Sequence, residues 1–221
     1  NIIAEHTLGF MINFSRKFCK FHEQKNEGKW NRLKVGQLEN RTLGVIGLGS
    51  IGSEIARRAK AFEMNVIGTK KETKKDIEGV DEIYSPDELK TVLSQSDYVV
   101  SIVPLTDETE GMFGSEEFEI MKESAYFINM ARGEVVNEPA LIDALRNDKI
   151  AGAGLDVFAE EPLPEDSPFY ELENVIMTPH VGGAFPEYNE KAIKILVDNL
   201  RSFIDDDSEE MVNIINYELG Y

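Results

Sequence analysis

The chain has 221 residues, of which 42% are hydrophobic, and carries a formal net charge of −18 with a pI near 4.6. This is enough apolar material for one large domain or two small ones. So negative a surface repels nucleic acid and anionic membranes, and we expect neither as a partner. Cys19 is the only cysteine, so no internal disulfide can form and a reducing cytoplasm is the expected compartment. No apolar run approaches the ~20 residues of a membrane span.

Residues 2–21 are predicted to form a helix with apolar side chains on two sides. One stripe consists of Leu8, Met11, Ile12 and Phe18, and the other of Phe10, Phe14 and Phe21. A helix that is apolar on two faces must be covered on both, either by the protein's own core or by a second subunit. Residues 22–41 are polar and are predicted to form a connecting loop.

From residue 42 onward, strand patterns and helix patterns alternate. Strands are predicted at 42–46, 66–68, 98–103, 125–129, 151–155 and 175–177. Helices are predicted at 51–62, 86–94, 116–121, 138–146 and 186–204. This alternation predicts an α/β fold, a Rossmann-type doubly wound parallel sheet with helices on both faces.

Three glycines follow the first of these strands and open the next helix. In such a turn Gly47 allows a tight bend, Gly49 lets a pyrophosphate approach the backbone, and Gly52 lets helix and strand pack closely. The helix N-terminus adds unpaired N–H groups and a partial positive charge. Because the glycines stand between a strand and a helix, they predict dinucleotide binding rather than an ordinary turn.

The end of the second strand bears on the choice between NAD and NADP. In NAD-binding domains an acid commonly stands here and bonds the ribose 2′-hydroxyl. This chain has Thr69 instead, followed by Lys70, Lys71, Lys74 and Lys75. The lysines could bind the 2′-phosphate of NADP, or they could form a solvated lysine-rich loop. The missing acid favours NADP over NAD.

Three polar residues that follow later strands fit the needs of one reaction. Reduction of a 2-oxo acid needs a cation for the substrate carboxylate, which the forked guanidinium of Arg132 can supply. The carbonyl oxygen needs a proton donor, and histidine is the residue type most often used for this role, which makes His180 the candidate. A carboxylate such as Glu161 can orient a protonated histidine. Taken one at a time, each could equally be an ordinary surface or loop residue.

Around these residues the chain resembles the D-isomer-specific 2-hydroxyacid dehydrogenases, which include phosphoglycerate dehydrogenase and the glyoxylate and hydroxypyruvate reductases. The matching stretches are Asn129–Val136, Leu155–Phe158 with Glu161-Pro162, and Pro179–Gly183. The resemblance implies D-specific hydride transfer between NAD(P)H and a small 2-oxo or 2-hydroxy acid. It assigns the catalytic roles to Arg132, Glu161 and His180.

The resemblance also implies a set of cofactor contacts and no metal site. Beside Gly47, Gly49, Gly52, Thr69, Lys70 and Lys71, the set contains Ser50, Ile51, Val103, Pro104, Thr109, Ala131, Asp156, Gly182 and Gly183. Asp156 is expected to reach the nicotinamide carboxamide. Asn137 replaces the family's usual aspartate, and we expect only a structural effect. His6 and His22 match no catalytic position and are expected to serve packing or to lie on the surface.

The same resemblance divides the chain into three parts. Residues 1–21 would be a helix of the dimerisation type that leads into the cofactor domain, and 22–185 the NAD(P)-binding Rossmann domain. Residues 186–221 would be a C-terminal helix and tail that return toward a substrate domain whose N-terminal part is absent. We therefore expect one wall of an active site, poor activity of this chain by itself, and a homodimer.

Two other functions fit the same residues. A non-enzymatic, NAD(P)-sensing protein of the co-repressor type would act through partner binding, and turnover of glyoxylate, hydroxypyruvate or 3-phosphohydroxypyruvate would exclude it. A phosphonate dehydrogenase-like enzyme would keep Arg132, Glu161 and His180. A formate dehydrogenase fits less well because it usually lacks the Glu–His pair. The identity of the 2-hydroxy acid is left open.

Overall fold

The computed structural model describes residues 2–73, 76–205 and 210–215. The chain divides into two compact units, Asn1–Gly182 and Gly183–Tyr221. Within the described residues, no helix is both long enough and apolar enough to span a bilayer.

The first unit is built on a parallel sheet whose strands run in the order β3-β2-β1-β4-β5-β6-β7. The strands are β1 (Thr42–Ile46), β2 (Asn65–Thr69), β3 (Glu82–Tyr84), β4 (Tyr98–Ser101), β5 (Tyr126–Asn129), β6 (Gly152–Leu155) and β7 (Val175–Met177). Strands β4 and β6 are buried along their length and β1 is buried after Thr42, as is usual when helices cover both faces of a parallel sheet. The predicted Rossmann-type α/β fold is confirmed.

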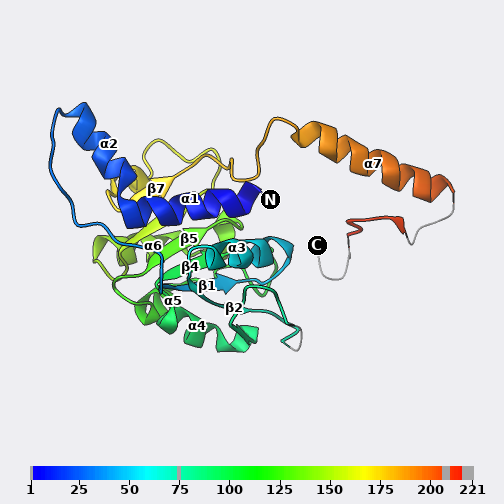
Figure 1. Ribbon diagram of the computed structural model, residues 1–221, viewed down its shortest axis with the longest axis horizontal. Helices are drawn as coiled ribbons and strands as arrows, with labels where there is room; N and C mark the ends of the chain where they lie inside the picture. Colours follow the sequence, from blue (N-terminus) through cyan, green and yellow to red (C-terminus); the bar gives the residue numbers. More distant parts are fainter. Residues whose placement is uncertain (1, 74–75, 206–209, 216–221) are drawn as a thin grey trace. The chain divides into compact units, whose positions relative to one another are not determined.

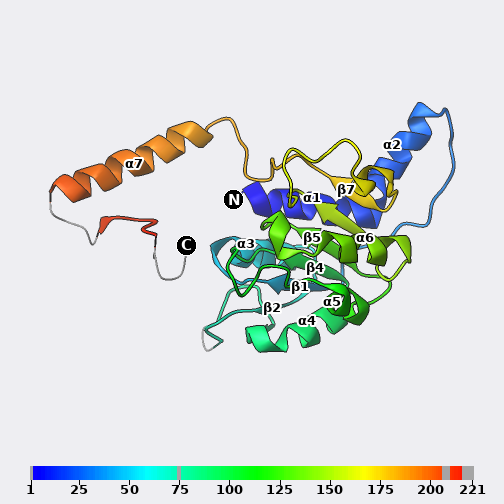
Figure 2. The same cartoon turned by 180° about the vertical axis from the view of Figure 1, so that it is seen from behind.

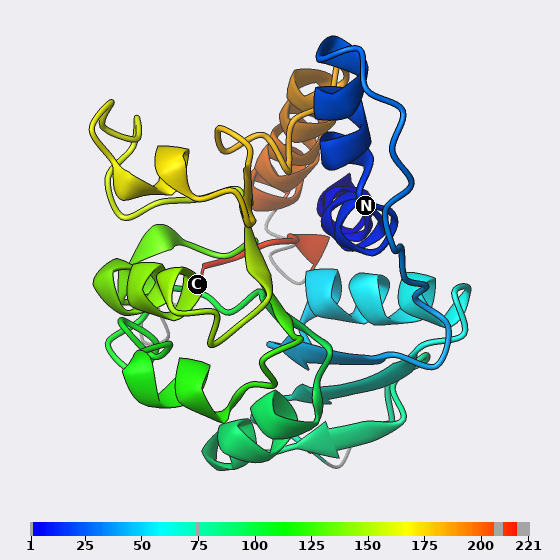
Figure 3. The same ribbon diagram turned by 90° about the vertical axis from the view of Figure 1, so that its left-hand side faces the viewer.

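Helices cover the sheet on both sides. Helices α1 (Ile2–Arg16) and α3 (Ser50–Lys60) pack on one face, and α4 (Leu89–Gln95), α5 (Ser115–Ile120) and α6 (Glu138–Arg146) pack on the other. Figures 1 and 2, seen from opposite sides, place α1 and α4 on opposite sides of the strands, and Figure 3 shows the two helical layers. The core is correspondingly divided into two apolar clusters, one between the sheet and each layer.

Helix α6 illustrates how local sequence sets an element's bounds. Its predicted bounds, 138–146, agree with the structure. The side chain of Asn137 caps the helix, because its Oδ1 accepts a hydrogen bond from the amide of Ala140 at 3.0 Å. Asparagine and aspartate are equally good caps. Asn137, which departs from the family pattern, therefore has the structural role expected of it.

The predicted single helix over 2–21 is wrong, because it breaks at Lys17. Lys17 has a φ of 56°, and a second helix, α2 (Phe18–Asn26), follows it. The side chain of Asn13 stabilises the break, since its Oδ1 accepts a hydrogen bond from the amide of Cys19 at 3.0 Å. The break removes Phe18 from the predicted apolar stripe and leaves it 58% exposed. The loop begins after α2 rather than at residue 22.

The other differences from the prediction concern short elements. The short edge strand β3 was not predicted, because three residues carry too little pattern. The helix predicted at 86–94 begins as the 3₁₀ turn η1 (Pro86–Glu88) before α4. Two further 3₁₀ turns, η2 (Gly133–Val135) and η3 (Pro168–Glu171), lie in loops.

The second unit contains helix α7 (Tyr188–Ile204), which begins two residues later than predicted. Its apolar side chains fall at helical spacing, as an amphipathic helix requires. Those that are exposed are Ile193, Ile195, Leu196, Val197, Leu200, Phe203 and Ile204.

Candidate active site

The glycine turn after β1 is shaped by close backbone contacts. Gly47 has a φ of 106°, and a Cβ built on it would lie 2.9 Å from the carbonyl oxygen of Ile102. A Cβ on Gly52 would lie 2.2 Å from the carbonyl oxygen of Gly47. At Gly49, where α3 begins, a Cβ would meet no described atom within 4 Å apart from its chain neighbours. This open, N–H-rich side of the turn fits the pyrophosphate of a dinucleotide.

The variant Gly49→Ala is expected to fold normally and to bind NADH and NADPH at least about tenfold more weakly. The added methyl group clashes with no protein atom but occupies the space where the pyrophosphate would approach. Fluorescence titration gives the affinities, and thermal unfolding checks the fold. Gly9→Ala in α1 is the matched control, because its Cβ would also meet nothing. Unchanged affinity in Gly49→Ala would remove the pyrophosphate from this turn.

Thr69, at the end of β2, holds the glycine turn in place. Its side chain is buried, and Oγ1 accepts a hydrogen bond from the amide of Gly47 at 3.2 Å. Its carbonyl oxygen accepts another from the amide of Leu48 at 2.8 Å. Thr69 therefore holds the glycine turn through two hydrogen bonds, and its own contact with a cofactor stays a prediction.

Two of the lysines stand close to the glycine turn and the loop after β4. The Nζ of Lys70 donates a hydrogen bond to the carbonyl oxygen of Leu48 at 3.2 Å. The Nζ of Lys71 forms an exposed ion pair with Glu108 at 2.8 Å. The contact of Lys70 and Lys71 with a cofactor stays a prediction. Lys74 and Lys75 lie outside the described residues.

Arg132 follows β5 on a loop that the side chain of Asn129 holds through two hydrogen bonds. The buried Asn129 accepts a hydrogen bond from the amide of Ala131 at 3.1 Å and donates one to the carbonyl oxygen of Arg132 at 2.9 Å. Arg132 Nη1 donates to the carbonyl oxygen of Ala131 at 2.7 Å, and its side chain is exposed. Asn129 was not predicted as a site residue, although it opens the Asn129–Val136 stretch of the resemblance.

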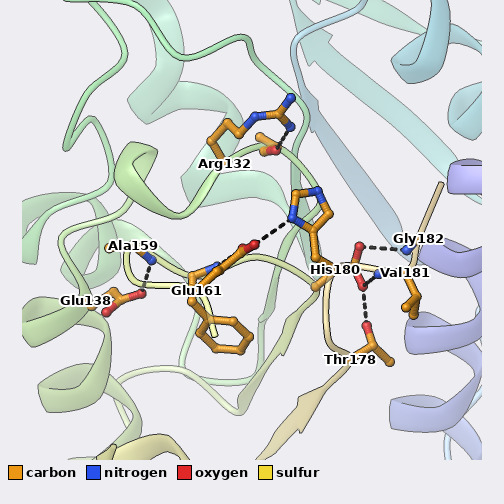
Figure 4. Close-up of polar contacts among 11 residues, drawn as sticks. Arg132, Glu138, Ala159, Glu161, Thr178, His180, Val181 and Gly182 are labelled. Atoms are coloured by element: carbon orange, nitrogen blue, oxygen red, sulfur yellow. Dashed lines mark hydrogen bonds and ion pairs between the residues drawn. The ribbon is translucent and has the colours of Figure 1, made fainter. Parts of the chain in front are cut away.

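The loop that carries Glu161 runs directly against the loop of Arg132. A Cβ built on Gly133 would lie 1.9 Å from the carbonyl carbon of Phe158, so only glycine fits there. Farther along, Glu138 of α6 accepts a hydrogen bond from the amide of Ala159 at 2.8 Å (Figure 4). Gly133 and Glu138 therefore set the path of the chain toward Glu161, and neither was predicted as a site residue.

His180 and Glu161 form a direct pair. The Nδ1 of His180 lies 2.7 Å from Oε2 of Glu161, whose Oε1 accepts a hydrogen bond from the amide of Phe158 at 2.9 Å. Facing an ionised carboxylate, Nδ1 carries the proton and donates it. Nε2 makes no hydrogen bond to any described residue. Figure 4 shows the ring between the Glu161 carboxylate and the Arg132 guanidinium, so the structure brings the three predicted catalytic residues together.

The pKa of the Glu161 carboxyl lies below its usual value. Burial raises it, but hydrogen bonds from His180 and from the Phe158 amide, together with the positive charges of His180 and Arg132, lower it more. The carboxylate is therefore ionised at neutral pH and can hold the proton on Nδ1. Its contribution to stability is present above the unfolded-state pKa and is lost as the pH falls through the lower folded-state value.

Asp156 fixes the turn that carries His180. His180 has a φ of 51°, and its amide donates to the carbonyl oxygen of Asp156 at 2.8 Å. The buried carboxylate accepts hydrogen bonds from the Thr178 hydroxyl (2.5 Å) and from the amides of Val181 (3.0 Å) and Gly182 (2.8 Å). Asp156 therefore acts as a positioning residue. Its predicted contact with the nicotinamide carboxamide stays a prediction.

His6 of α1 also belongs to this network, in addition to the packing role expected of it. Its ring packs edge-on against Phe10, and Nε2 lies 3.0 Å from the Thr178 hydroxyl oxygen. Because Thr178 gives its proton to Asp156, His6 must donate here from Nε2. No motif indicated this link, since the two residues lie 172 positions apart. His22 is exposed on α2.

The remaining predicted cofactor residues follow strands of the sheet in the sequence, either in loops or at the start of a helix. Ser50 and Ile51 begin α3, while Val103 and Pro104 follow β4. The Thr109 hydroxyl donates to the carbonyl oxygen of Pro104 at 2.6 Å and so shapes that loop. Ala131 and Gly182 are buried beside Arg132 and Asp156, and Gly183 begins the second unit. Their contacts with a cofactor stay predictions.

A cavity of about 620 Å³ opens beside the His180–Glu161 pair. This volume suits a small organic ligand. Its walls are mainly apolar, and the His180–Glu161 pair supplies its ionisable side chains together with the hydroxyl groups of Tyr170 and Thr178. The lining residues are Phe158, Glu161, Pro162, Leu163, Tyr170, Met177, Thr178, Pro179 and His180.

Known proteins match the chain over most of its length. The profile of the family described as "D-isomer specific 2-hydroxyacid dehydrogenase, NAD binding domain" matches residues 8–182. The chain is 37% identical to a glyoxylate reductase from Korarchaeum cryptofilum, over 98% of this chain and 66% of that protein. It is 36% identical to a D-3-phosphoglycerate dehydrogenase from Methanocaldococcus jannaschii, over 97% of this chain and 41% of that protein.

A solved structure agrees with these sequence matches. It is a D-isomer-specific 2-hydroxyacid dehydrogenase from Xanthobacter autotrophicus in complex with NADPH and MES. The TM-score is 0.88 at 33% identity, and the match covers 100% of this chain and 89% of the other.

Proposed function

The chain belongs to the D-isomer-specific 2-hydroxyacid dehydrogenase family, whose NAD-binding domain it contains, and we propose that it serves hydride transfer between NAD(P)H and a small 2-oxo acid. It spans 41% to 66% of the first two relatives named above, so the activity of the whole protein is part of this proposal. The observation that carries it is the 2.7 Å pair of His180 and Glu161 beside Arg132.

The proposed reaction assigns one task to each of these side chains. The exposed guanidinium of Arg132 binds the substrate carboxylate and fixes its plane. Glu161 holds the proton on Nδ1 and stabilises the charged ring, so Nε2 of His180 can give its proton to the carbonyl oxygen. A reduced nicotinamide cofactor, when bound at the glycine turn, supplies the hydride. In the reverse direction Nε2 accepts the proton from the hydroxyl group.

The test is a paired screen of NADH and NADPH oxidation with glyoxylate, hydroxypyruvate and 3-phosphohydroxypyruvate. Turnover of a 2-oxo acid to its D-hydroxy acid supports the proposal. Tight binding of the cofactor without turnover of any of these acids would contradict it and support the nucleotide-sensing alternative. Reduction of NAD or NADP coupled to the oxidation of phosphite would instead point to the phosphonate-type enzyme.

We further propose that NADP is preferred over NAD. The end of β2 carries no acid, Lys70 hydrogen-bonds to the glycine turn, and Lys71 pairs with Glu108 in the loop after β4 of a strongly acidic chain. The double variant Lys70→Ala, Lys71→Ala is expected to raise the Kd for NADPH about tenfold and leave that for NADH nearly unchanged. Equal losses for both cofactors would contradict a phosphate pocket. Lys20→Ala with Lys25→Ala, two exposed lysines on α2, is the control.

A homodimer is also proposed, because α2 and the loop after it expose large apolar side chains. Phe18 is 58% exposed and Trp30 is 96% exposed, which is unusual for aromatic residues on a monomer. Sedimentation analysis of the wild type and of Trp30→Ser tests the dimer.

The presence of a single cysteine supports a reducing compartment such as the cytoplasm.

A further inference from the structure

A second cavity lies at the opposite edge of the sheet from the catalytic residues. Its volume is about 200 Å³, and it lies within the first unit. Tyr98 begins β4 and Tyr126 begins β5, whereas the catalytic loops follow the other ends of such strands. The lining residues are Phe14, Ser15, Lys17, Gly36, Gln37, Arg41, Asp97, Tyr98, Ser124 and Tyr126. None of them belongs to the site described above.

Two tyrosines give this cavity an aromatic wall. Tyr126 stacks between Phe14 and Tyr98, with ring centroids 4.4 Å and 5.5 Å away. The Tyr126 hydroxyl forms no hydrogen bond with the described residues, whereas the Tyr98 hydroxyl lies within hydrogen-bonding reach of the Ser15 side chain. Burial raises the pKa of Tyr98 to about 12 and also raises that of Tyr126, so both hydroxyls keep their protons and are hydrogen-bond donors.

Ser15 adds a third hydroxyl to the same cavity. It is 5% exposed, and apart from its contact with the Tyr98 hydroxyl its Oγ has no hydrogen-bond partner within the described part of the chain. Ser15 and Arg41 both lie close enough to the Tyr98 hydroxyl to oppose the rise in its pKa. A buried hydroxyl without a good partner costs free energy, so a ligand or water that accepts its proton would be stabilising.

The cavity is lined by two cationic side chains, Lys17 and Arg41, and by one carboxylate, Asp97. Asp97 already accepts hydrogen bonds from the amide of Thr42 at 2.8 Å and from Lys122 at 3.1 Å. Arg41 approaches it only to 3.8 Å, which leaves its guanidinium donors largely unused. Lys17, half-buried at the helix break, makes no side-chain hydrogen bond or ion pair with the described residues.

We propose that this cavity is a binding site for a small carboxylate. The three hydroxyl groups, Arg41 and Lys17 supply donors and positive charge for an oxyanion, in a chain that otherwise repels anions. The stacked rings supply an apolar wall for a short carbon chain, which favours a carboxylate over inorganic phosphate. The volume admits a ligand of a few carbon atoms. This site is independent of the proposed function.

Succinate and malonate are suitable probes, because they lack the oxo or hydroxy group that the catalytic site is proposed to use. Calorimetric titration of the wild-type chain is expected to show one saturable site for one of them. Tyr126→Phe and Arg41→Gln are each expected to weaken this binding about tenfold or more, since each removes a donor to a charged group. Thermal unfolding and backbone amide NMR spectra check that each variant is folded.

Two arginine variants serve as controls. Arg32→Gln, on the exposed loop after α2, and Arg132→Gln, in the catalytic site, should bind the probe as the wild type does. Absence of saturable binding would overturn the proposal, as would binding that Arg132→Gln abolishes and Arg41→Gln preserves. Phosphate bound as tightly as the dicarboxylates would overturn the assignment to carboxylates.

Discussion

Replacing His180 with glutamine is expected to lower kcat by about 100-fold or more, the usual contribution of a positioned general acid. The amide of glutamine can still donate a hydrogen bond to Glu161, whose carboxylate lies 2.7 Å from Nδ1 in the wild type. It cannot act as a general acid, because an amide N–H does not ionise near neutral pH. The measurement is steady-state reduction of the best 2-oxo acid found in the screen. Cofactor affinity should change little, because the imidazole is proposed to contact the substrate.

His22→Gln is the matched control, since His22 is exposed on α2 and has no assigned catalytic role. It should retain normal turnover. Near-normal turnover of His180→Gln would show that another group donates the proton. In Glu161→Gln the partner charge that favours the protonated ring is lost, so the alkaline limb of the kcat profile should move to lower pH. An unmoved profile would mean that Glu161 only packs against the ring.

Gly133→Ala is expected to disturb both stability and catalysis, although the change adds a single methyl group. Its Cβ would lie 1.9 Å from the carbonyl carbon of Phe158, and that overlap with backbone can be relieved only by moving the loop. Relief of this kind costs about 1–3 kcal/mol of unfolding free energy. Because the Phe158 amide holds Glu161, the movement should also disturb the His180 pair and lower kcat.

Chemical denaturation and steady-state kinetics measure the two effects of Gly133→Ala. The matched control is Gly114→Ala, whose Cβ would meet only the end of the flexible Glu117 side chain at 3.4 Å. That variant should lose little stability and no activity. A Gly133→Ala protein as stable and active as Gly114→Ala would show that the two loops do not constrain each other.

Much of the fold could be predicted because its elements carry strong local patterns. The buried run of β1, the glycine turn and the capped helix α6 are each determined within a few residues, and the structure agrees with them. The break at Lys17 could not be predicted in this way. Both sides of the break have helical sequences, and what separates them is a hydrogen bond from the Cys19 amide to the Asn13 side chain.

The catalytic residues were identifiable from residue type and order, whereas the residues that position them were not. Arg132, Glu161 and His180 stand in recognisable motifs. Asn129 and Glu138 orient the same loops through hydrogen bonds to backbone atoms, and such bonds leave no periodic pattern in a sequence.

By itself, the sequence determined the family, the parallel α/β sheet and the types of side chain available for the chemistry, because these depend on local patterns and on motifs. The tertiary structure alone decided that His6 joins the Asp156–Thr178 network, and that Ser15, Tyr98 and Tyr126 line one cavity. The physical reason is that both arrangements join residues from distant elements. Their closeness is set by how α1 packs on the sheet, which no short stretch of sequence encodes.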